Sequence, residues 1–348
     1  MSREQARRVL FICDLGPPFT GHQFRTTGVG GTESCVVLLA EEFAARGASV
    51  VVANRVPAAA VERAVRYVPL DAIGTGPFDL IVLWKRWSDV AAGLDGRKVF
   101  LWTDAHITEE ANLSRCRQWA DLTCTLSEFT RGRLAAATGE ERLLAVGAPI
   151  ETGDYAAAPV KTERWLLYCS VPDRGLYYLK DLFPRIRRQV PDARLAITSD
   201  FTLWGKEPAK AAFLRFFEGS DGVEYLGHVS RTELVAWQHR ARVMAFPCNF
   251  EEGFCLAAAE CMAAGAVPVT TGRYALVQTV GDGGVLIGGH PRSWLYGRRF
   301  VRACVKLLTD DARWQEYMDR GRSRALREYA PGQVLDRMLQ ALEASPSR

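Results

Sequence analysis

One carboxylate inside an apolar helix constrains the fold of this chain more than any other feature. The helix is predicted within residues 247–265, which read Pro-Cys-Asn-Phe-Glu-Glu-Gly-Phe-Cys-Leu-Ala-Ala-Ala-Glu-Cys-Met-Ala-Ala-Gly. Small apolar residues surround Glu260 on all sides, and a helix that is apolar all round is a buried helix. An ionised carboxylate in such a place is costly unless a partner satisfies it. We therefore expect Glu260 to have a partner other than bulk water.

A second glutamate, Glu252, stands directly before Gly253-Phe254, where the helix is expected to begin. In one continuous helix the two carboxylates would lie about 12 Å apart along the axis. The helix N-terminus between them offers backbone N–H groups that can bind a phosphate. This order of groups suits a ligand with hydroxyls at both ends and phosphates in the middle, such as a sugar nucleotide.

The stretch resembles the E-x7-E signature of retaining glycosyltransferases with the GT-B fold, in particular family 4. That signature usually reads Glu-Gly-Phe-Gly, then an apolar helix with the second Glu, then Ala-Met-Ala-x-Gly-x-Pro-Val. The chain follows it at residues 252–255, 260–263, 265 and 268–269, with cysteine at two of these positions. Two glutamates at this spacing would be a weak signal alone, and the flanking residues make it a strong one.

Length and composition favour a globular protein with two domains. The chain has 348 residues, of which 48% are apolar, and no uninterrupted run of eighteen apolar residues predicts a membrane span. The N-terminus lacks the apolar stretch of a secretion signal. The net charge of +4 comes mostly from dispersed arginine, so no nucleic-acid partner is expected. Nine scattered cysteines without a C-x-x-C pair predict reduced, buried thiols in a cytosolic protein.

Short β-rich runs alternate with helical stretches in two series along the chain. This alternation predicts parallel sheets that are covered by helices on both faces. The resemblance implies the α/β fold called GT-B, with two Rossmann-like, doubly wound parallel-sheet domains that face an interdomain cleft. We expect domains at 1–155 and 160–320, and a C-terminal helix over 321–348 that crosses back to the first domain. The expected strands are 9–13, 49–53, 79–84, 98–102 and 121–126, followed by 165–170, 194–198, 223–226, 243–246, 267–271 and 284–287.

A glycine-rich loop over residues 27–33 follows the first expected strand and precedes an amphipathic helix over 34–46. Gly30 and Gly31 allow backbone N–H groups to approach an anion. The loop resembles the Gly-Gly-[Thr/Ala]-Glu loop of the same glycosyltransferases, which faces the donor diphosphate and the acceptor. A nicotinamide or flavin dinucleotide site fits poorly, because Glu33 stands where its fingerprint needs a third glycine. The remaining alternative is that the glycines of this loop only form a turn and bind no ligand.

The resemblance places a histidine just after the strand expected at 98–102, near the sugar that is transferred. His106 is predicted to take this role, with Asp104 as the alternative contact or as an orienting or acceptor-binding group. Without the resemblance, a lone histidine at a strand end is more often a surface residue.

Two further donor contacts are assigned from the resemblance. Arg174 matches the position of a diphosphate-binding lysine, and an arginine can hold a diphosphate with two parallel hydrogen bonds. A second cation is expected at the position of Cys169 or Ser170, where the sequence has none. His228 lies in a segment whose backbone commonly recognises the nucleotide base, although a loop histidine in water is an equally simple interpretation.

The resemblance implies transfer of a hexosyl group from a nucleoside diphosphate sugar to an acceptor hydroxyl, with retention of anomeric configuration. Such a reaction belongs to glycan, polysaccharide or glycoconjugate biosynthesis. Glu252 and His106 are the expected catalytic residues, and Glu260 is expected to bind ribose hydroxyls. The other expected donor-binding residues are Gly30, Gly31, Arg174, Gly253, Phe254, Cys255 and His228.

No metal or other cofactor is expected, because no Asp-x-Asp pair stands at a strand end. The expected partners are a nucleoside diphosphate sugar and an acceptor of unknown identity, which can be a glycan, a lipid-linked compound or a small molecule. The expected location is cytoplasmic, either free or peripheral to the inner face of a membrane. Other enzymes with this fold remain open, namely a sugar-nucleotide epimerase or a phosphorylase, as does a non-catalytic protein that binds nucleotide sugars.

Overall fold

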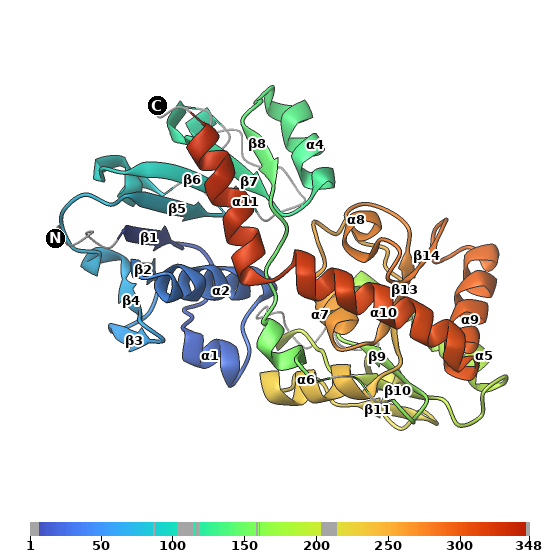
Figure 1. Ribbon diagram of the computed structural model, residues 1–348. Helices are drawn as coiled ribbons and strands as arrows, with labels where there is room; N and C mark the ends of the chain where they lie inside the picture. The colour runs from blue at the N-terminus through green and yellow to red at the C-terminus, as the bar shows by residue number, and fades with distance from the viewer. Residues whose placement is uncertain are drawn as a thin grey trace. The chain divides into compact units, whose positions relative to one another are not determined.

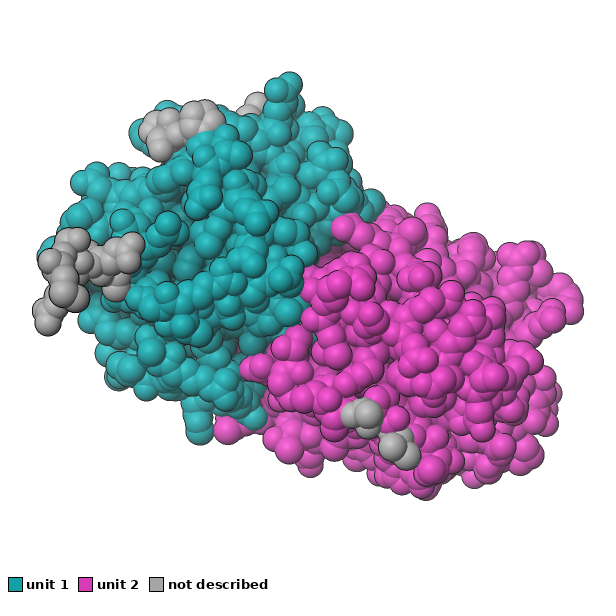
Figure 2. Space-filling model, in the orientation of Figure 1, with its two compact units in different colours: residues 1–25, 31–150, 330–348 teal, residues 26–30, 151–329 magenta. Residues whose placement is uncertain are grey.

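The structure is a computed structural model that describes residues 7–85, 88–102, 114–115, 118–157, 159, 161–202 and 214–345. The chain forms two compact units, which Figure 2 shows in different colours. Unit 1 comprises residues 1–25, 31–150 and 330–348, and unit 2 comprises residues 26–30 and 151–329. The domain boundaries given above stay a prediction.

Unit 1 is built on an eight-stranded sheet with the order β3-β4-β2-β1-β5-β6-β7-β8 (Figure 1). Leu10 of β1 lies opposite Val51 of β2 and Ile81 of β5, and both pairings are parallel. Only β3 pairs in antiparallel fashion among the described strands. The strands are β1 (Arg8–Ile12), β2 (Ser49–Asn54), β3 (Ala60–Glu62), β4 (Val65–Pro69), β5 (Leu80–Trp84), β6 (Arg97–Trp102), β7 (Leu122–Thr125) and β8 (Leu143–Ala145).

Helices α2 and α11 pack against each other in unit 1. The end of α2 is tied to α11 by Arg46, which donates to Asp336 Oδ1 at 2.5 Å and to the Gly332 carbonyl at 3.1 Å. The helix α10 (Asp311–Glu328) ends before Pro331, because proline has no N–H to continue a helix and is favoured in the first turn of the next one. The helices of unit 1 are α1 (Gly21–Arg25), α2 (Gly31–Ala45), α4 (Glu128–Thr138) and α11 (Pro331–Ala344), with short 3-10 turns at η1 (Leu70–Ala72) and η2 (Asp89–Gly93).

Unit 2 is built on a six-stranded sheet with the order β11-β10-β9-β12-β13-β14, and all its pairings are parallel. Leu167 of β9 lies opposite Ala196 of β10 on one side and Met244 of β12 on the other. The strand order therefore reverses between β9 and β12. The strands are β9 (Trp165–Tyr168), β10 (Arg194–Ile197), β11 (Val223–Tyr225), β12 (Val243–Phe246), β13 (Val267–Thr271) and β14 (Val285–Ile287).

Helices cover the second sheet, with α5 packed on α9 and α10 packed on α7 (Figure 1). Their apolar side chains and those of the strands form one continuous core. None of the helices in the described part of the chain combines the length and apolar character that a membrane span needs. The helices of unit 2 are α5 (Leu176–Arg187), α6 (Arg231–Arg240), α7 (Leu256–Ala263), α8 (Leu276–Val280), α9 (Trp294–Thr309) and α10 (Asp311–Glu328), with 3-10 turns at η3 (Thr152–Tyr155), η4 (Pro172–Arg174) and η7 (Leu214–Phe216).

Both ends of α6 are satisfied by side chains. At its start, Ser230 and Glu233 form a reciprocal capping box that satisfies two backbone N–H groups. At its end, the Lys161 ammonium donates to the Gln238 carbonyl at 3.1 Å and also to the Ala241 carbonyl. These contacts hold both ends of α6, the helix that carries Arg231 and Gln238.

All eleven strands expected from the sequence are present, within one or two residues at their ends. The sequence did not indicate β3, β4 and β8. β3 and β8 are short edge strands of three residues each, and none of their side chains is fully buried. β3 reads Ala-Val-Glu and β8 reads Leu-Leu-Ala, so neither strand has the run of four or more apolar residues by which a buried strand is recognised.

The junction between η4 and α5 generates a first prediction. Gly175 has φ of 142°, and a Cβ built there would lie 2.4 Å from the Pro247 carbonyl oxygen. We expect Gly175→Ala to lower the free energy of unfolding by about 3 kcal/mol or more, because strain and steric overlap add. Gly219→Ala is the matched control, since Gly219 has φ of 72° with open space around it. It should cost about 1–2 kcal/mol. Equal urea midpoints for the two variants would contradict the steric argument.

Lys161 generates a prediction about pH. Burial lowers the pKa of its ammonium from 10.5 to about 7. Between these two values the unfolded chain holds a proton that the folded chain has released, so stability rises with pH across this window. We expect the free energy of unfolding of the wild type, relative to Lys161→Met, to rise between pH 7 and pH 10 by at most about 1.4 kcal/mol per unit. Urea titrations at several pH values measure this slope, and a flat difference would show that Lys161 is not neutral in the folded protein.

Candidate functional site

The site is built where the strand order of unit 2 reverses. Because β10 and β12 flank β9 on opposite sides, the connections that follow β9 and β12 diverge from one edge of the sheet. A crevice forms at such a point outside the carboxyl ends of parallel strands, and ligands bind there in doubly wound folds. The connection after β9 carries Arg174, and the connection after β12 carries Glu252.

Arg174 and Glu252 form an ion pair at this point. NH1 of Arg174 donates to the two carboxylate oxygens of Glu252 at 3.0 and 3.1 Å. The guanidinium also lies over the ring of Phe250, 4.4 Å from its centroid. The Glu252 side chain is 4% exposed and that of Arg174 is 30% exposed. Within the described ranges, Nε and NH2 of Arg174 have no hydrogen-bond partner, so the guanidinium keeps donors for an anion.

Burial raises the pKa of the Glu252 carboxyl, and the charge of Arg174 lowers it in part. A carboxylate removed from water is costly unless it is paired and hydrogen-bonded. Arg174 therefore does two things, since it stabilises the buried carboxylate and presents a cation at the edge of the sheet. The sequence predicted both residues separately as site residues, and the fold brings them into contact.

The helix that carries Glu260 begins later than the sequence suggested. α7 starts at Leu256, not at Gly253, because Cys255 adopts a left-handed conformation with φ of 78° and ψ of 76°. The preceding Phe254 is buried against the ring of Tyr329, with centroids 4.9 Å apart, and its carbonyl accepts a hydrogen bond from Thr279. Glu252 thus lies on a turn before the helix, and the 12 Å spacing along one continuous helix does not apply.

Glu260 lies inside α7, where most of the helix is buried as predicted. NH1 of Arg231 donates to its Oε1 at 2.6 Å, and Nε2 of Gln238 donates to its Oε2 at 3.2 Å. The Tyr155 hydroxyl donates to Oε1 of Gln238 at 2.7 Å and accepts from NH2 of Arg231 at 3.3 Å. These four side chains close a ring of hydrogen bonds, which supplies the partner that the sequence required for Glu260.

Arg231 was not predicted as a site residue. It is the first residue of α6, and its Nε and NH2 also contact Oδ2 of Asp154 at 3.2 and 2.9 Å. Burial lowers the pKa of Arg231, but the charges and hydrogen bonds of Glu260, Tyr155 and Asp154 together raise it above its ordinary value, so the guanidinium is a cation. Local sequence patterns could not identify Arg231, because 28 residues lie between it and Glu260 along the chain. The only signal in the sequence is that the buried Glu260 carboxylate needs a positively charged partner.

The glycine-rich loop divides between the units, since Gly30 ends a segment of unit 2 and Gly31 is the first residue of α2 in unit 1. The helix begins at Gly31, three residues before the expected position 34, and includes Thr32 and Glu33 in its first turn. The Thr32 hydroxyl donates to the Glu33 carboxylate at 3.0 Å. In unit 2, the Arg231 backbone N–H donates to the Thr26 carbonyl at 3.2 Å. Diphosphate contact by this loop stays a prediction.

His228 precedes α6 in a loop that is anchored to the preceding crossover. Its backbone N–H donates to Oδ2 of Asp200 at 3.1 Å, and its side chain is half-buried. Its predicted contact with a base stays untested. His106 and Asp104 lie outside the described residues.

Seven of the eight cysteines that the structure describes are buried, as the sequence predicted, and Cys169 is half-buried. The described cysteines, 13, 35, 124, 169, 248, 255, 261 and 304, are all free. Sγ of Cys169 lies 3.6 Å from Sγ of Cys261, so the position where a second cation was expected packs on α7. In the same part of the chain, no three His, Cys, Asp or Glu side chains are grouped as a metal site would require. The prediction of metal-independence stays open.

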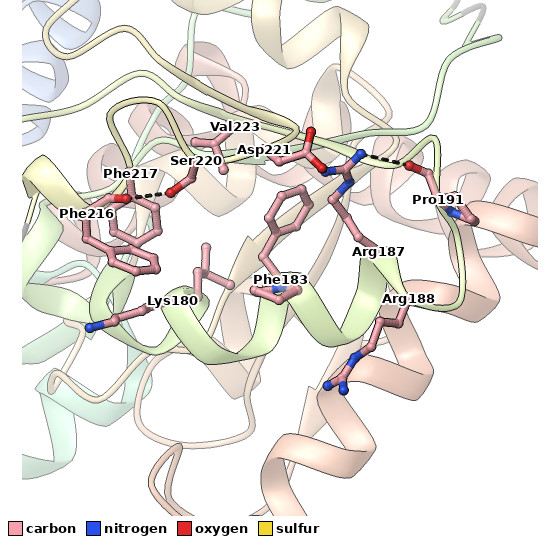
Figure 3. A pocket seen from close by; sticks show the side chains of 12 residues that line it. Lys180, Phe183, Arg187, Arg188, Pro191, Phe216, Phe217, Ser220, Asp221 and Val223 are labelled. Atoms are coloured by element: carbon pink, nitrogen blue, oxygen red, sulfur yellow. Dashed lines mark hydrogen bonds and ion pairs between the residues drawn. The ribbon is translucent and has the colours of Figure 1, made fainter.

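A separate pocket of about 470 Å³ lies between α5 and residues 214–223 of unit 2 (Figure 3). The rings of Phe183, Phe216 and Phe217 form part of its wall, and Arg187 at its rim is paired with Asp221. None of its lining residues was predicted as a site residue, so this pocket is not part of the site described above.

One family model matches part of this chain, and many solved structures have a similar fold. Residues 164–310 match the family model described as Glycosyl transferases group 1. A search of curated protein sequences gives no match. Among solved structures, sucrose-phosphate synthase from Thermosynechococcus elongatus is 17% identical, with a TM-score of 0.75 over 97% of this chain and 98% of that chain.

Two further structures of similar fold belong to proteins with a known ligand or a known role. HepE of Anabaena, in complex with UDP and glucose, is 14% identical with a TM-score of 0.71 over 97% of this chain and 100% of that chain. WaaG, a glycosyltransferase involved in lipopolysaccharide biosynthesis, is 16% identical with a TM-score of 0.65 over 94% of this chain and 98% of that chain. The chain therefore has the two-domain, Rossmann-like GT-B fold, and its second unit contains the segment that matches the group 1 glycosyl transferases.

Proposed function

We propose that the protein is a retaining glycosyltransferase of family 4 type. It moves a hexosyl group from a nucleoside diphosphate sugar to an acceptor hydroxyl and keeps the anomeric configuration. The observation that carries the proposal is the contact between Arg174 and Glu252 at the point where the strand order of unit 2 reverses. This pair lies within the segment that matches the group 1 glycosyl transferases.

The chemistry of the pair suits a donor whose diphosphate lies beside its sugar. Arg174 has free N–H donors and is partly exposed, so it can hold the diphosphate. Glu252 accepts hydrogen bonds from sugar hydroxyls while the charge of Arg174 favours its ionised form. The backbone N–H groups of Phe254 and Cys255 add donors of the kind that bind phosphate, and Gly253 is proposed to lie beside the donor with them.

In the proposed reaction, the bond between the anomeric carbon and the phosphate oxygen breaks, and the acceptor oxygen bonds to that carbon on the same face. The proton of the acceptor hydroxyl passes to the leaving phosphate. Negative charge grows on this phosphate in the transition state, so fixed donors and the Arg174 cation lower the barrier. No metal is assigned a role, and His106 is proposed to contact the transferring sugar.

Glu260 is proposed to bind the ribose of the donor, and His228 to lie near its base. HepE of Anabaena, which has a similar fold, binds UDP and glucose, and this makes a uridine donor the first to test. The acceptor is proposed to be a hydroxyl compound of glycan, lipid-linked or small-molecule type. We further propose a cytoplasmic location, either free or at the inner face of a membrane.

A donor screen tests the proposal first. A ligand present at 100 times its Kd stabilises the folded state by about 2.7 kcal/mol. We therefore expect one class among UDP, GDP, ADP and dTDP sugars to raise the melting temperature clearly and to be turned over. Proton NMR of the product should show the anomeric configuration of the donor. Inversion would reject the retaining mechanism, turnover to an epimer without acceptor would indicate an epimerase, and binding without turnover would indicate a binding protein.

Isosteric variants test the two glutamates. We expect Glu252→Gln to lower kcat/KM by about 100-fold or more, because an amide accepts hydrogen bonds from the sugar hydroxyls less strongly than a carboxylate and no longer holds Arg174 in an ion pair. Glu260→Gln should mainly raise the KM for the donor, by about tenfold, because the ribose is remote from the bond that breaks. Steady-state kinetics at saturating acceptor separate the two effects.

The neighbouring Glu251→Gln is the matched control, since it also neutralises one acid of the same loop. It should leave kcat and KM within about threefold of the wild type, and circular dichroism should show that all three variants fold. Wild-type kinetics for both Glu252→Gln and Glu260→Gln would reject the proposed function.

A further inference from the structure

The side chain of Arg231 meets its two acidic partners with different atoms. Its NH1 contacts Glu260 at 2.6 Å, and its Nε and NH2 contact Asp154. The guanidinium is 10% exposed, so little of it is open to solvent. A planar guanidinium with two partners in fixed directions cannot rotate without breaking contacts. Arg231 thus holds the Glu260 carboxylate in one orientation.

The ring of hydrogen bonds also fixes the amide that completes the contact. The Gln238 side chain is fully buried, and its Oε1 accepts from the Tyr155 hydroxyl. This leaves Nε2 of Gln238 as the donor to Oε2 of Glu260. Because the members of the ring hydrogen-bond to one another with little exposure to solvent, the loss of one member weakens the contacts of the others.

The Glu260 carboxylate keeps acceptor capacity after these contacts. Each oxygen of an ionised carboxylate can accept about two hydrogen bonds. In the described part of the chain, Oε1 accepts one from Arg231 and Oε2 accepts one from Gln238. One further position therefore remains on each oxygen, and 11% of the side chain is exposed. Two adjacent acceptors of this kind match a pair of vicinal hydroxyls.

We propose that Arg231 is a positioning residue that orients Glu260 to read the vicinal hydroxyls of a ribose, so that the site selects ribonucleotides over 2′-deoxyribonucleotides. This inference rests on the proposed function, because it assigns the ribose to Glu260. Arg231 itself contacts no ligand and acts through the carboxylate. Its backbone N–H to the Thr26 carbonyl ties the start of the glycine-rich loop to the same helix terminus.

The test compares ribonucleotides with their 2′-deoxy counterparts by isothermal titration calorimetry. The probes are UDP, GDP and ADP, each with its 2′-deoxy form, and the proteins are the wild type, Arg231→Lys, Arg231→Met and Arg242→Met. Arg242→Met is the matched control, because Arg242 is 7% exposed and paired with Asp311 elsewhere in unit 2. A ratio of two dissociation constants on one protein is insensitive to a loss of folded material that affects both probes alike.

We expect the wild type to bind the ribonucleotide of its preferred base about tenfold more tightly than the deoxy form, as one charge-assisted hydrogen bond allows. Arg242→Met should keep that ratio. Arg231→Met should reduce it to about twofold or less, and Arg231→Lys, which keeps the charge but not the two directions, should fall between. If Arg231→Met does not fold, Arg231→Lys alone decides, because its ratio must fall below that of Arg242→Met.

Three outcomes would overturn the inference, and they are distinguishable. A wild type that binds none of the six nucleotides overturns the inference, and the donor screen described above then decides the proposed function separately. A wild type that binds both forms equally shows that Glu260 reads no 2′-hydroxyl. A wild-type ratio that survives in both Arg231 variants leaves the proposed function intact and shows that Arg231 has a structural role alone.

Discussion

The cost of burying a carboxylate is the constraint on which the site depends. Glu252 and Glu260 are both removed from water, and an unpaired carboxylate in either place would destabilise the fold by several kcal/mol. The fold meets this cost twice with arginine, since Arg174 pairs with Glu252 and Arg231 pairs with Glu260. Each pair joins segments far apart in the sequence. The groups that stabilise unit 2 are therefore the groups that its proposed chemistry uses.

The sheet of unit 2 determines where these pairs form. Parallel strands place all their carboxyl ends at one edge, and the reversal between β9 and β12 opens the connections that carry Arg174 and Glu252. Gly175 allows the first connection to turn close to the Pro247 carbonyl, where a side chain would not fit. The backbone conformation of Gly175 thus contributes to the geometry of the ion pair between Arg174 and Glu252, which lie 78 residues apart in the sequence.

Much of the fold could be predicted from the sequence because buried parallel strands are continuous apolar runs, and the chain contains eleven that are recognisable. Exposed edge strands such as β3 carry no such pattern. The start of α7 could not be predicted either, because a cysteine rarely adopts the left-handed conformation that Cys255 has. For the site, local spacing identified Glu252, Glu260 and Arg174. It could not identify Arg231, whose role depends on a long-range pairing.

The two arginines differ in what they leave available, and this difference separates their proposed roles. Arg174 uses one nitrogen on Glu252 and is 30% exposed, so it can meet an incoming phosphate without losing its carboxylate. Arg231 is 10% exposed and divides its nitrogens among Glu260, Asp154 and Tyr155. A ligand that took a hydrogen bond from Arg231 would have to break the ring that holds Glu260. Direct anion binding therefore falls to Arg174, and orientation of an acceptor group falls to Arg231.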